Sequence, residues 1–373
     1  MPALQNPQDN IAEKSRRYST IKYSLHIIGL VYVLLLLAAS MVSGVSAVLA
    51  KGVALAVAPG FLALPVYLLV IYCAYYILSF PLNFYQSFIL EHQFQLTRQS
   101  IKNWFLDQLK SGAISYIISI VLLEVFYALL GSQPRNWWWI VSLVWIFLSL
   151  VLAKLAPVII IPLFFKYKKF SDDDLRKRII GLSEKMKLKI LDVFEIDLSR
   201  QTEKANAALV GFGSTRRVIL GDTLKNKYSP EEIEVILAHE FAHQKLGHLL
   251  KLVLIGAFST LLCFFIIYKT SSYALLFFGA DQLSDISALP VVFIYLVLLG
   301  VFLQPWDNFL SRRFETQADK LAINTTGMKE AFISTMDKLA GQNLSDRNPH
   351  PFIKFFFFDH PPIDDRIKLA RSL

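Results

Sequence analysis

The chain has 373 residues, of which 54% are hydrophobic and 18% are charged, and its formal net charge at pH 7 is +9. Soluble globular domains carry charge on about a quarter of their residues, so this composition argues against a soluble enzyme. The 29 Phe, 15 Tyr and 6 Trp residues exclude a disordered or fibrous chain, because so much aromatic surface has to be buried. We therefore expect an integral membrane protein.

Long apolar runs along the chain predict membrane-spanning helices. A helix needs about 20 apolar residues to cross the hydrocarbon core of a bilayer. Runs that reach or approach this length lie at 24–50, 61–81, 113–132, 138–165, 250–268 and 288–307. They predict six spans, or seven if the region 24–81 divides differently. The first run is too long for a cleaved signal peptide and is expected to be an uncleaved anchor.

The spans divide the chain into membrane and polar parts. The expected parts are an N-terminal segment 1–23, four spans in 24–165 with a loop at 82–112, a soluble segment 166–249, two spans in 250–307, and a terminal segment 308–373. Most Lys and Arg residues lie in the polar parts, which six spans place on one side, and the positive-inside rule makes that side cytoplasmic. The chain has a net positive charge but no nucleic-acid-binding motif, so we expect lipid and not nucleic acid as a partner.

The soluble segment is predicted to be a small α+β unit. Ser171 to Asp174 can cap a helix that runs to about Lys187, and 193–198 alternates like a half-exposed strand. Two shorter strands, 207–212 and 217–220, flank a glycine-containing turn and predict a hairpin. Ser229-Pro230-Glu231-Glu232 is a strong helix start with a capping box, so the residues that follow it lie on a helix.

This helix carries His239-Glu240-Phe241-Ala242-His243, the pattern His-Glu-x-x-His. Residues four apart share one face of a helix, so both imidazoles can bind one metal ion while Glu240 reaches a bound water. Two surface histidines on a solvated helix are the alternative. The pattern predicts a zinc peptidase site with Glu240 as general base.

A catalytic zinc ion takes three protein ligands and keeps an open position for water. His248 follows His243 by five residues, too far round a continuous helix to join the site. A polar stripe follows the sixth span, with Asn308, Arg312, Glu315 and Asp319 at spacings of four, three and four. Alone it could be a solvated flank. Opposite the histidine helix it favours Glu315 as the third ligand, Asp319 as the acceptor that orients a ligand histidine, and Arg312 as the partner of Glu315 or neighbouring carboxylates.

The C-terminal part adds an aromatic run, 355–358, followed by Asp359-His360-Pro361-Pro362 and later by Arg366. The run could anchor in the membrane or pack inside the protein, and packing is favoured. The prolines hold His360 near a helix start. Either His360 or Arg366 could donate a hydrogen bond to an oxyanion.

With these motifs together, the chain resembles the integral-membrane zinc metallopeptidases of the CAAX prenyl protease type I family. The resemblance rests on HEFAH after several spans, NFLSRRFETQAD after the next span, and DHPPIDDR near the C-terminus. Two further segments agree, from Glu91 to Lys110 and from Pro162 to Lys166. The likeness covers the chain from about residue 60 to the end. Eukaryotic members are longer and usually have seven spans.

The resemblance implies one Zn²⁺ per chain, with His239, His243 and Glu315 as ligands and Glu240 as general base. It implies Asn206 as a contact to the substrate backbone, and His360 and Arg366 near the reacting carbonyl. Substrate is expected to add as a strand beside an edge strand that begins near Ala207. The implied fold is an all-α polytopic membrane protein whose helices enclose a chamber, with the small α+β zinc-peptidase domain attached.

The expected activity is hydrolysis of peptide bonds, with removal of the C-terminal tripeptide of prenylated proteins. The expected partners are a peptide or protein substrate, prenylated or not, and the lipid bilayer; the oligomeric state stays open. The expected location is the cell membrane of a prokaryote or the endoplasmic reticulum of a eukaryote. Two alternatives are an HtpX-like quality-control protease of membrane proteins and a non-enzymatic transporter.

Overall fold

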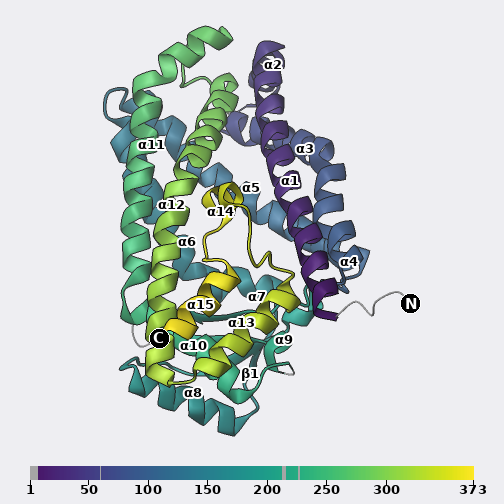
Figure 1. Ribbon diagram of the computed structural model, residues 1–373. Coiled ribbons are helices and arrows are strands. Elements are labelled where there is room, and N and C mark those ends of the chain that lie inside the picture. Colours follow the sequence, from purple (N-terminus) through teal and green to yellow (C-terminus); the bar gives the residue numbers. More distant parts are fainter. Residues whose placement is uncertain (1–6, 59, 212–215, 226) are drawn as a thin grey trace, which may run out of the picture.

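The computed structural model describes residues 7–58, 60–211, 216–225 and 227–373. Within these ranges, six helices are long and apolar enough to cross a membrane, which agrees with the six predicted spans. They are contained in the segments Ile11–Val42, Gly60–Gln93, Ile101–Ser132, Trp137–Phe164, His248–Phe278 and Ile286–Thr326. The principal helices of these segments are α1 (Pro7–Val42), α3 (Ala63–Phe84), α5 (Ile101–Ser132), α6 (Trp137–Leu155), α11 (His248–Phe278) and α12 (Leu289–Thr326) (Figure 1).

The first predicted span is divided in the structure. Helix α1 ends at Val42, and Gly44 adopts φ 72°, a left-handed conformation that suits glycine. The following helix α2 (Val45–Ala56) has 12 residues and is too short to cross a bilayer. The region 24–81 therefore contributes two long helices and one short one, and the seventh span is not formed among the described residues.

Aromatic side chains fill the core between the membrane helices. Tyr67 of α3, Phe126 of α5 and Phe264 of α11 are each at most 2% exposed. On the outer surface, large apolar side chains such as Leu276 and Phe302 are 82% and 79% exposed. Burying them in lipid removes the cost that this exposure would have in water.

The soluble segment contains a four-stranded sheet in the order β1-β2-β4-β3. The strands are β1 (Tyr167–Lys169), β2 (Val193–Ile196), β3 (Ala207–Val210) and β4 (Arg217–Gly221). Strands β3 and β4 pair antiparallel, as the hairpin prediction requires, and the turn at 212–215 lies outside the described residues. Strands β2 and β4 pair parallel, and β1, which was not predicted, pairs with β2. Strand β3 lies at an edge of the sheet.

Helix α10 (Pro230–Lys245) begins with the predicted capping box. The Ser229 hydroxyl accepts a hydrogen bond from the Glu232 backbone N–H at 3.3 Å, and the Glu232 carboxylate accepts one from the Ser229 N–H at 2.8 Å. The buried face of α10 packs on α12, where Leu237 and Phe241 share a core with Ala318 and Ala322. This contact fixes α10 and α12 side by side.

Shorter elements complete the fold. The α-helices are α4 (Leu90–Gln93), α7 (Ile161–Phe164), α8 (Asp173–Lys185), α9 (Asp222–Lys225), α13 (Lys329–Asn343), α14 (Pro351–Phe357) and α15 (Ile363–Ser372). Single π-helical turns, Tyr85–Ile89 and Ala156–Ile160, interrupt two membrane segments, and short 3₁₀ turns lie at Gly60–Leu62, Leu198–Arg200 and Ile286–Ala288.

Helix α14 lies between α1 and α12 (Figure 1). The ring of Phe357, at its end, stacks on Tyr23 of α1 at a centroid distance of 5.7 Å. Phe352 and Phe355 remain 57% and 50% exposed. Packing, the favoured interpretation of the aromatic run, therefore applies to Phe357 but only in part to Phe355.

Candidate metal centre

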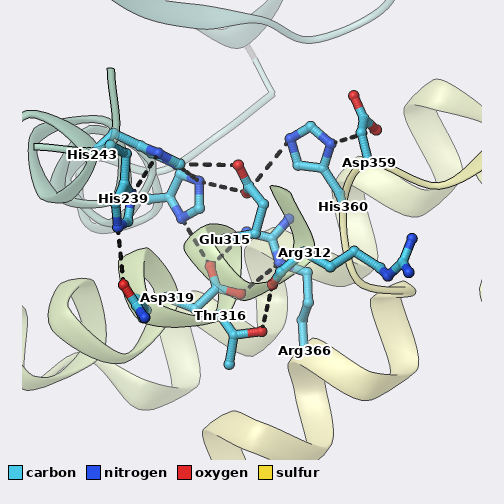
Figure 2. Close-up of polar contacts among 11 residues, drawn as sticks. His239, His243, Arg312, Glu315, Thr316, Asp319, Asp359, His360 and Arg366 are labelled. Carbon is cyan, nitrogen blue, oxygen red and sulfur yellow. Dashed lines mark hydrogen bonds and ion pairs between the residues drawn. The ribbon is translucent and has the colours of Figure 1, made fainter. Parts of the chain in front are cut away.

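Helices α10 and α12 bring together His239, His243 and Glu315, the three ligands expected from the sequence (Figure 2). The Nε2 atom of His239 lies 3.1 Å from Nε2 of His243 and 3.1 Å from a carboxylate oxygen of Glu315. The other Glu315 oxygen lies 3.2 Å from Nε2 of His243. One atom from each residue lies within 4.8 Å of the others, which is the arrangement that a single metal ion can bridge.

Asp319 lies one helical turn after Glu315 and contacts the other ring nitrogen of His239. The Nδ1 of His239 donates to Oδ1 of Asp319 at 2.8 Å, as predicted for a residue that orients a ligand. Burial lowers the pKa of His239, but its contacts with Asp319 and Glu315 outweigh burial and raise that pKa to about 10. A metal ion at this site therefore competes with a proton for the His239 ring.

His248 is not part of the ligand group, as the sequence argument predicted, but it contacts the second histidine, which that argument did not predict. Its Nδ1 lies 3.1 Å from Nδ1 of His243, and its Nε2 lies 3.1 Å from the side-chain oxygen of Gln317. A continuous helix would carry His248 away from the site, but Gly247 has φ 66° and breaks the helix, so the chain turns back. The glycine before His248 was the available signal.

Glu240 faces the cleft beside the metal cluster. Burial raises the pKa of its carboxyl group above the ordinary value. The cleft has a volume of about 560 Å³, and its lining includes Glu240, His239, Asn206, Ala207 and His360. The candidate base and the candidate substrate-binding residues thus share one cavity with a metal ligand.

His360 approaches the cluster from the loop before α15 (Figure 2). Its Nε2 lies 3.5 Å from Glu315, and its Nδ1 contacts the Asp359 carboxylate at 2.8 Å. The His360 side chain is 53% exposed, so it stands over the open side of the site. This position suits a hydrogen-bond donor to a reacting carbonyl.

Arg366 and Arg312 have contacts that the sequence did not predict. Arg366 donates from Nε and Nη2 to Asp319 at 2.8 and 2.6 Å and so holds this carboxylate in place, while Arg366 also lines the cleft. Arg312 contacts no carboxylate among the described residues; its Nη1 donates to the backbone oxygens of Lys354 and Phe358, at 3.1 and 2.5 Å. It therefore fixes the segment before His360.

Asn308, the first residue of the polar stripe, has the same kind of role as Arg312. Its side-chain amide donates to the backbone oxygen of Phe356 at 2.6 Å. The stripe on α12 thus divides by function: Glu315 and Asp319 face the histidines, and Asn308 and Arg312 hold the C-terminal segment against α12.

The donor set fits a catalytic zinc ion. Two imidazoles and one carboxylate leave a coordination position open for water, as catalytic zinc sites do. One oxygen of Glu315, Oε2, is buried and makes no hydrogen bond in the described part of the chain, although it lies 3.1 Å from Nε2 of His239 and 3.5 Å from Nε2 of His360. A buried carboxylate oxygen in that state is stabilised by a cation.

Comparison with known proteins places this geometry in a family. The model described as Peptidase family M48 matches residues 170–373, and the model described as CAAX prenyl protease N-terminal, five membrane helices, matches residues 5–166. The chain is 30% identical over 366 residues to a protein of Bacillus subtilis named Uncharacterized metalloprotease YhfN, covering 96% of this chain and 85% of that one. It is 28% identical to CAAX prenyl protease 1 of Saccharomyces cerevisiae, covering 78% and 68%.

A solved structure shares the fold. The crystal structure of S. mikatae Ste24p superposes with a TM-score of 0.86 and 23% identity, and the match covers 99% of this chain and 91% of that one. The predicted fold class, an all-α polytopic membrane protein with six or seven spans and a small α+β domain, is confirmed in its six-span form by this match and by the six candidate spans. The chain belongs to peptidase family M48 and is a multi-pass membrane metallopeptidase.

Proposed function

We propose that this protein is a zinc metalloendopeptidase that removes the C-terminal tripeptide of prenylated proteins. The observation that carries the proposal is the convergence of His239, His243 and Glu315 beside Glu240, at a cleft whose lining also includes Ala207, the first residue of the edge strand β3. The family membership supports the peptidase activity, and the prenyl specificity extends it by likeness to relatives named CAAX prenyl proteases.

His239, His243 and Glu315 would hold the metal ion. When bound, zinc supplies an acidified water and polarises the carbonyl of the scissile bond. Asp319 fixes the tautomer of His239 by accepting from Nδ1, and Arg366 holds Asp319. These contacts keep the Nε2 atom of His239 directed at the metal position.

Glu240 would accept the proton of the attacking water and pass it to the leaving amine. Its carboxyl group is buried, and burial raises its pKa toward the range that suits a general base and acid at neutral pH. His360, over the open side of the site, would donate to the carbonyl oxygen as negative charge develops there. Asp359 holds the His360 ring in that direction.

The substrate would lie along the outer edge of β3. Asn206, just before β3, is exposed and lines the cleft, and Ala207 is the first residue of the strand. An extended peptide can add to such an edge through main-chain hydrogen bonds, which bind the peptide independently of its side chains. The Asn206 amide then has the position to contact the substrate backbone.

The active site is proposed to face the cytoplasm, because the basic residues gather on the polar segments on this side of the spans. Turnover of misfolded membrane proteins is the second candidate function, since a strand-addition cleft accepts many sequences. The B. subtilis relative, named only as a metalloprotease, is equally consistent with it. The transporter alternative is contradicted by membership of a peptidase family.

A pair of peptides separates the two candidates. Detergent-purified protein is incubated with a farnesylated peptide carrying a free C-terminus and with its unprenylated twin, and Glu240→Ala protein serves as the blank. We expect release of a tripeptide from the farnesylated form at a much higher rate. Equal cleavage of both peptides would favour general turnover, and cleavage by the Glu240→Ala protein would contradict the proposed base.

A further inference from the structure

The substrate cleft ends against helix α1. At this end its lining includes Tyr18, Ser19, Lys22 and Tyr23 from α1, Asn343 at the end of α13, and the residues 344–346 that follow α13. The Ser19 hydroxyl donates to the backbone oxygen of Leu344 at 3.2 Å, and Tyr18 and Leu344 are buried in the same apolar cluster. Helix α1 is therefore a fixed wall of the cleft and not only a membrane anchor.

Two ammonium groups stand at this wall. Lys22 comes from α1, and Lys204 comes from the segment that leads into β3; both line the cleft. They share one acidic partner, because the Glu91 carboxylate lies 3.5 Å from Nζ of Lys22 and 3.2 Å from Nζ of Lys204. The two lysines and Glu91 together carry one excess positive charge.

Glu91 lies behind the two lysines. It lines a separate crevice of about 320 Å³ that also touches Lys204, and its side chain is only 15% exposed, against 33% and 32% for Lys22 and Lys204. The Tyr18 hydroxyl donates to Glu91 at 2.6 Å and accepts from Lys204 at 2.9 Å, which fixes the cluster. In the group of Lys22, Lys204 and Glu91, the two ammonium groups therefore face the cleft.

One other carboxylate lines this end of the cleft. The Asp346 side chain accepts from the backbone N–H of Asn348 at 3.3 Å, so it belongs to the turn after α13. No ion pair joins Asp346 to Lys22 or Lys204 in the described part of the chain, and both ammonium groups keep donor capacity for a ligand.

The direction in which a substrate strand binds to β3 places the C-terminus of the substrate near Lys22 and Lys204. Strand β3 pairs antiparallel with β4 on its inner side, and no strand of the described residues pairs with its outer edge. A peptide that adds antiparallel to β3 has its C-terminal end beside the residues that precede β3. Lys204 lies there, two residues before Asn206.

We propose that Lys22 and Lys204 form the subsite for the free terminal carboxylate of the substrate. The inference rests on the proposed function and deepens it, because a carboxylate held at a fixed wall places the scissile bond a fixed number of residues from the substrate's end. The enzyme would then select substrates by their free C-terminus as well as by sequence or lipid. Ion pairing and charge-assisted hydrogen bonds supply the recognition.

The first test compares one farnesylated peptide in two forms, with a free terminal carboxylate and with a terminal amide. We expect wild-type kcat/KM to be about 10- to 100-fold higher for the acid, the range for a hydrogen bond to a charged group. In the Lys22→Gln/Lys204→Gln protein, this ratio should fall to near one. Lys227→Gln, which removes a nearby lysine that pairs with Glu203 outside the cleft, should keep the wild-type ratio.

Equal wild-type rates for acid and amide would overturn the proposal without any variant. A ratio that survives in the double variant would overturn it as well. Binding of both peptides to Glu240→Ala protein is measured in parallel, so that recognition is separated from chemistry. If the peptide with the free carboxylate binds more tightly than the amide but the wild-type protein cleaves neither, the carboxylate subsite is supported and the proposed function is refuted. If the two peptides bind equally, the subsite is refuted, whether or not cleavage occurs.

Discussion

Asp319 connects the metal site with the C-terminal helix: it accepts a hydrogen bond from Nδ1 of His239 at 2.8 Å. The same carboxylate receives two hydrogen bonds from Arg366. Asp319 and Arg366 are 0% and 10% exposed at the side chain, so neither group can exchange its partner for bulk water. The orientation of one proposed ligand thus depends on a residue near the C-terminus.

Substitution of Asp319 tests this connection. We expect Asp319→Asn to weaken zinc binding about 10- to 100-fold, the range for loss of a partner that orients a ligand histidine. The change also leaves Arg366 buried without a counter-charge, which costs about 3–5 kcal/mol of stability. Competition with a chelator measures the first effect and thermal unfolding the second. Asp174→Asn, at a carboxylate that is 99% exposed, is the control, and equal zinc affinity in both variants would contradict the assignment.

Zinc affinity should depend on pH because a proton occupies the same ring. Asp319 and Glu315 raise the pKa of His239 to about 10 in the metal-free site, and metal binding requires the neutral imidazole. Below that pKa, each unit of decrease in pH favours the protonated form, so zinc affinity should fall by about tenfold per unit between pH 8 and pH 6. Calorimetry in buffers of different ionisation enthalpy would show the released proton. An affinity that does not change over this range would refute competition by His239.

The C-terminal segment should control the rate through Arg312. Its guanidinium donates to the backbone oxygens of Lys354 and Phe358, two residues of the segment that leads to His360. We expect Arg312→Gln to lower kcat/KM at least about tenfold, because the proposed oxyanion donor loses its fixed position. Zinc content should not change. Arg313→Gln, one residue on and exposed, is the matched control, and an equal loss of activity in the two variants would contradict a specific role for Arg312.

Stability at low pH should depend on Glu232. Burial alone would raise its pKa, but hydrogen bonds from Lys338, Ser334 and the Ser229 backbone outweigh burial and lower it below the ordinary 4.5. A carboxyl group with a lowered folded-state pKa stabilises fully above pH 4.5, and this contribution is lost as pH falls through the folded pKa. We expect Glu232→Gln to reduce stability by about 1–3 kcal/mol at pH 7 and by much less below pH 4. A thermal-unfolding difference that is the same at both pH values would refute this role.

The sequence predicted correctly those parts of the fold that depend on residues close together in the chain, such as the length of an apolar run or the capping of a helix. The six spans follow from the length of apolar runs, and the α10 start follows from Ser229 and Pro230. The first span was placed too far along the chain because hydropathy alone does not register the break at Gly44. Strand β1 was missed because three residues carry no periodicity.

The site shows the same division between local and distant contacts. The convergence of His239, His243 and Glu315 could be predicted, since helix periodicity and the known needs of zinc limit the choices. The partners of Arg312 and Arg366 could not, because they are set by how α12 packs on α14 and α15. His248 was correctly left out of the ligand group, but its contact with His243 could not be predicted because Gly247 breaks the helix.

The central claim, a zinc ion working with Glu240, is tested most directly by measuring bound zinc and peptide cleavage together in the Glu240→Ala protein. Removing the base should leave the three ligands in place, so we expect about one zinc per chain and a loss of turnover of at least about a hundredfold. Zinc retained with undiminished turnover would contradict the role of Glu240. Turnover that persists after zinc has been stripped from the wild-type protein would contradict the metal mechanism itself.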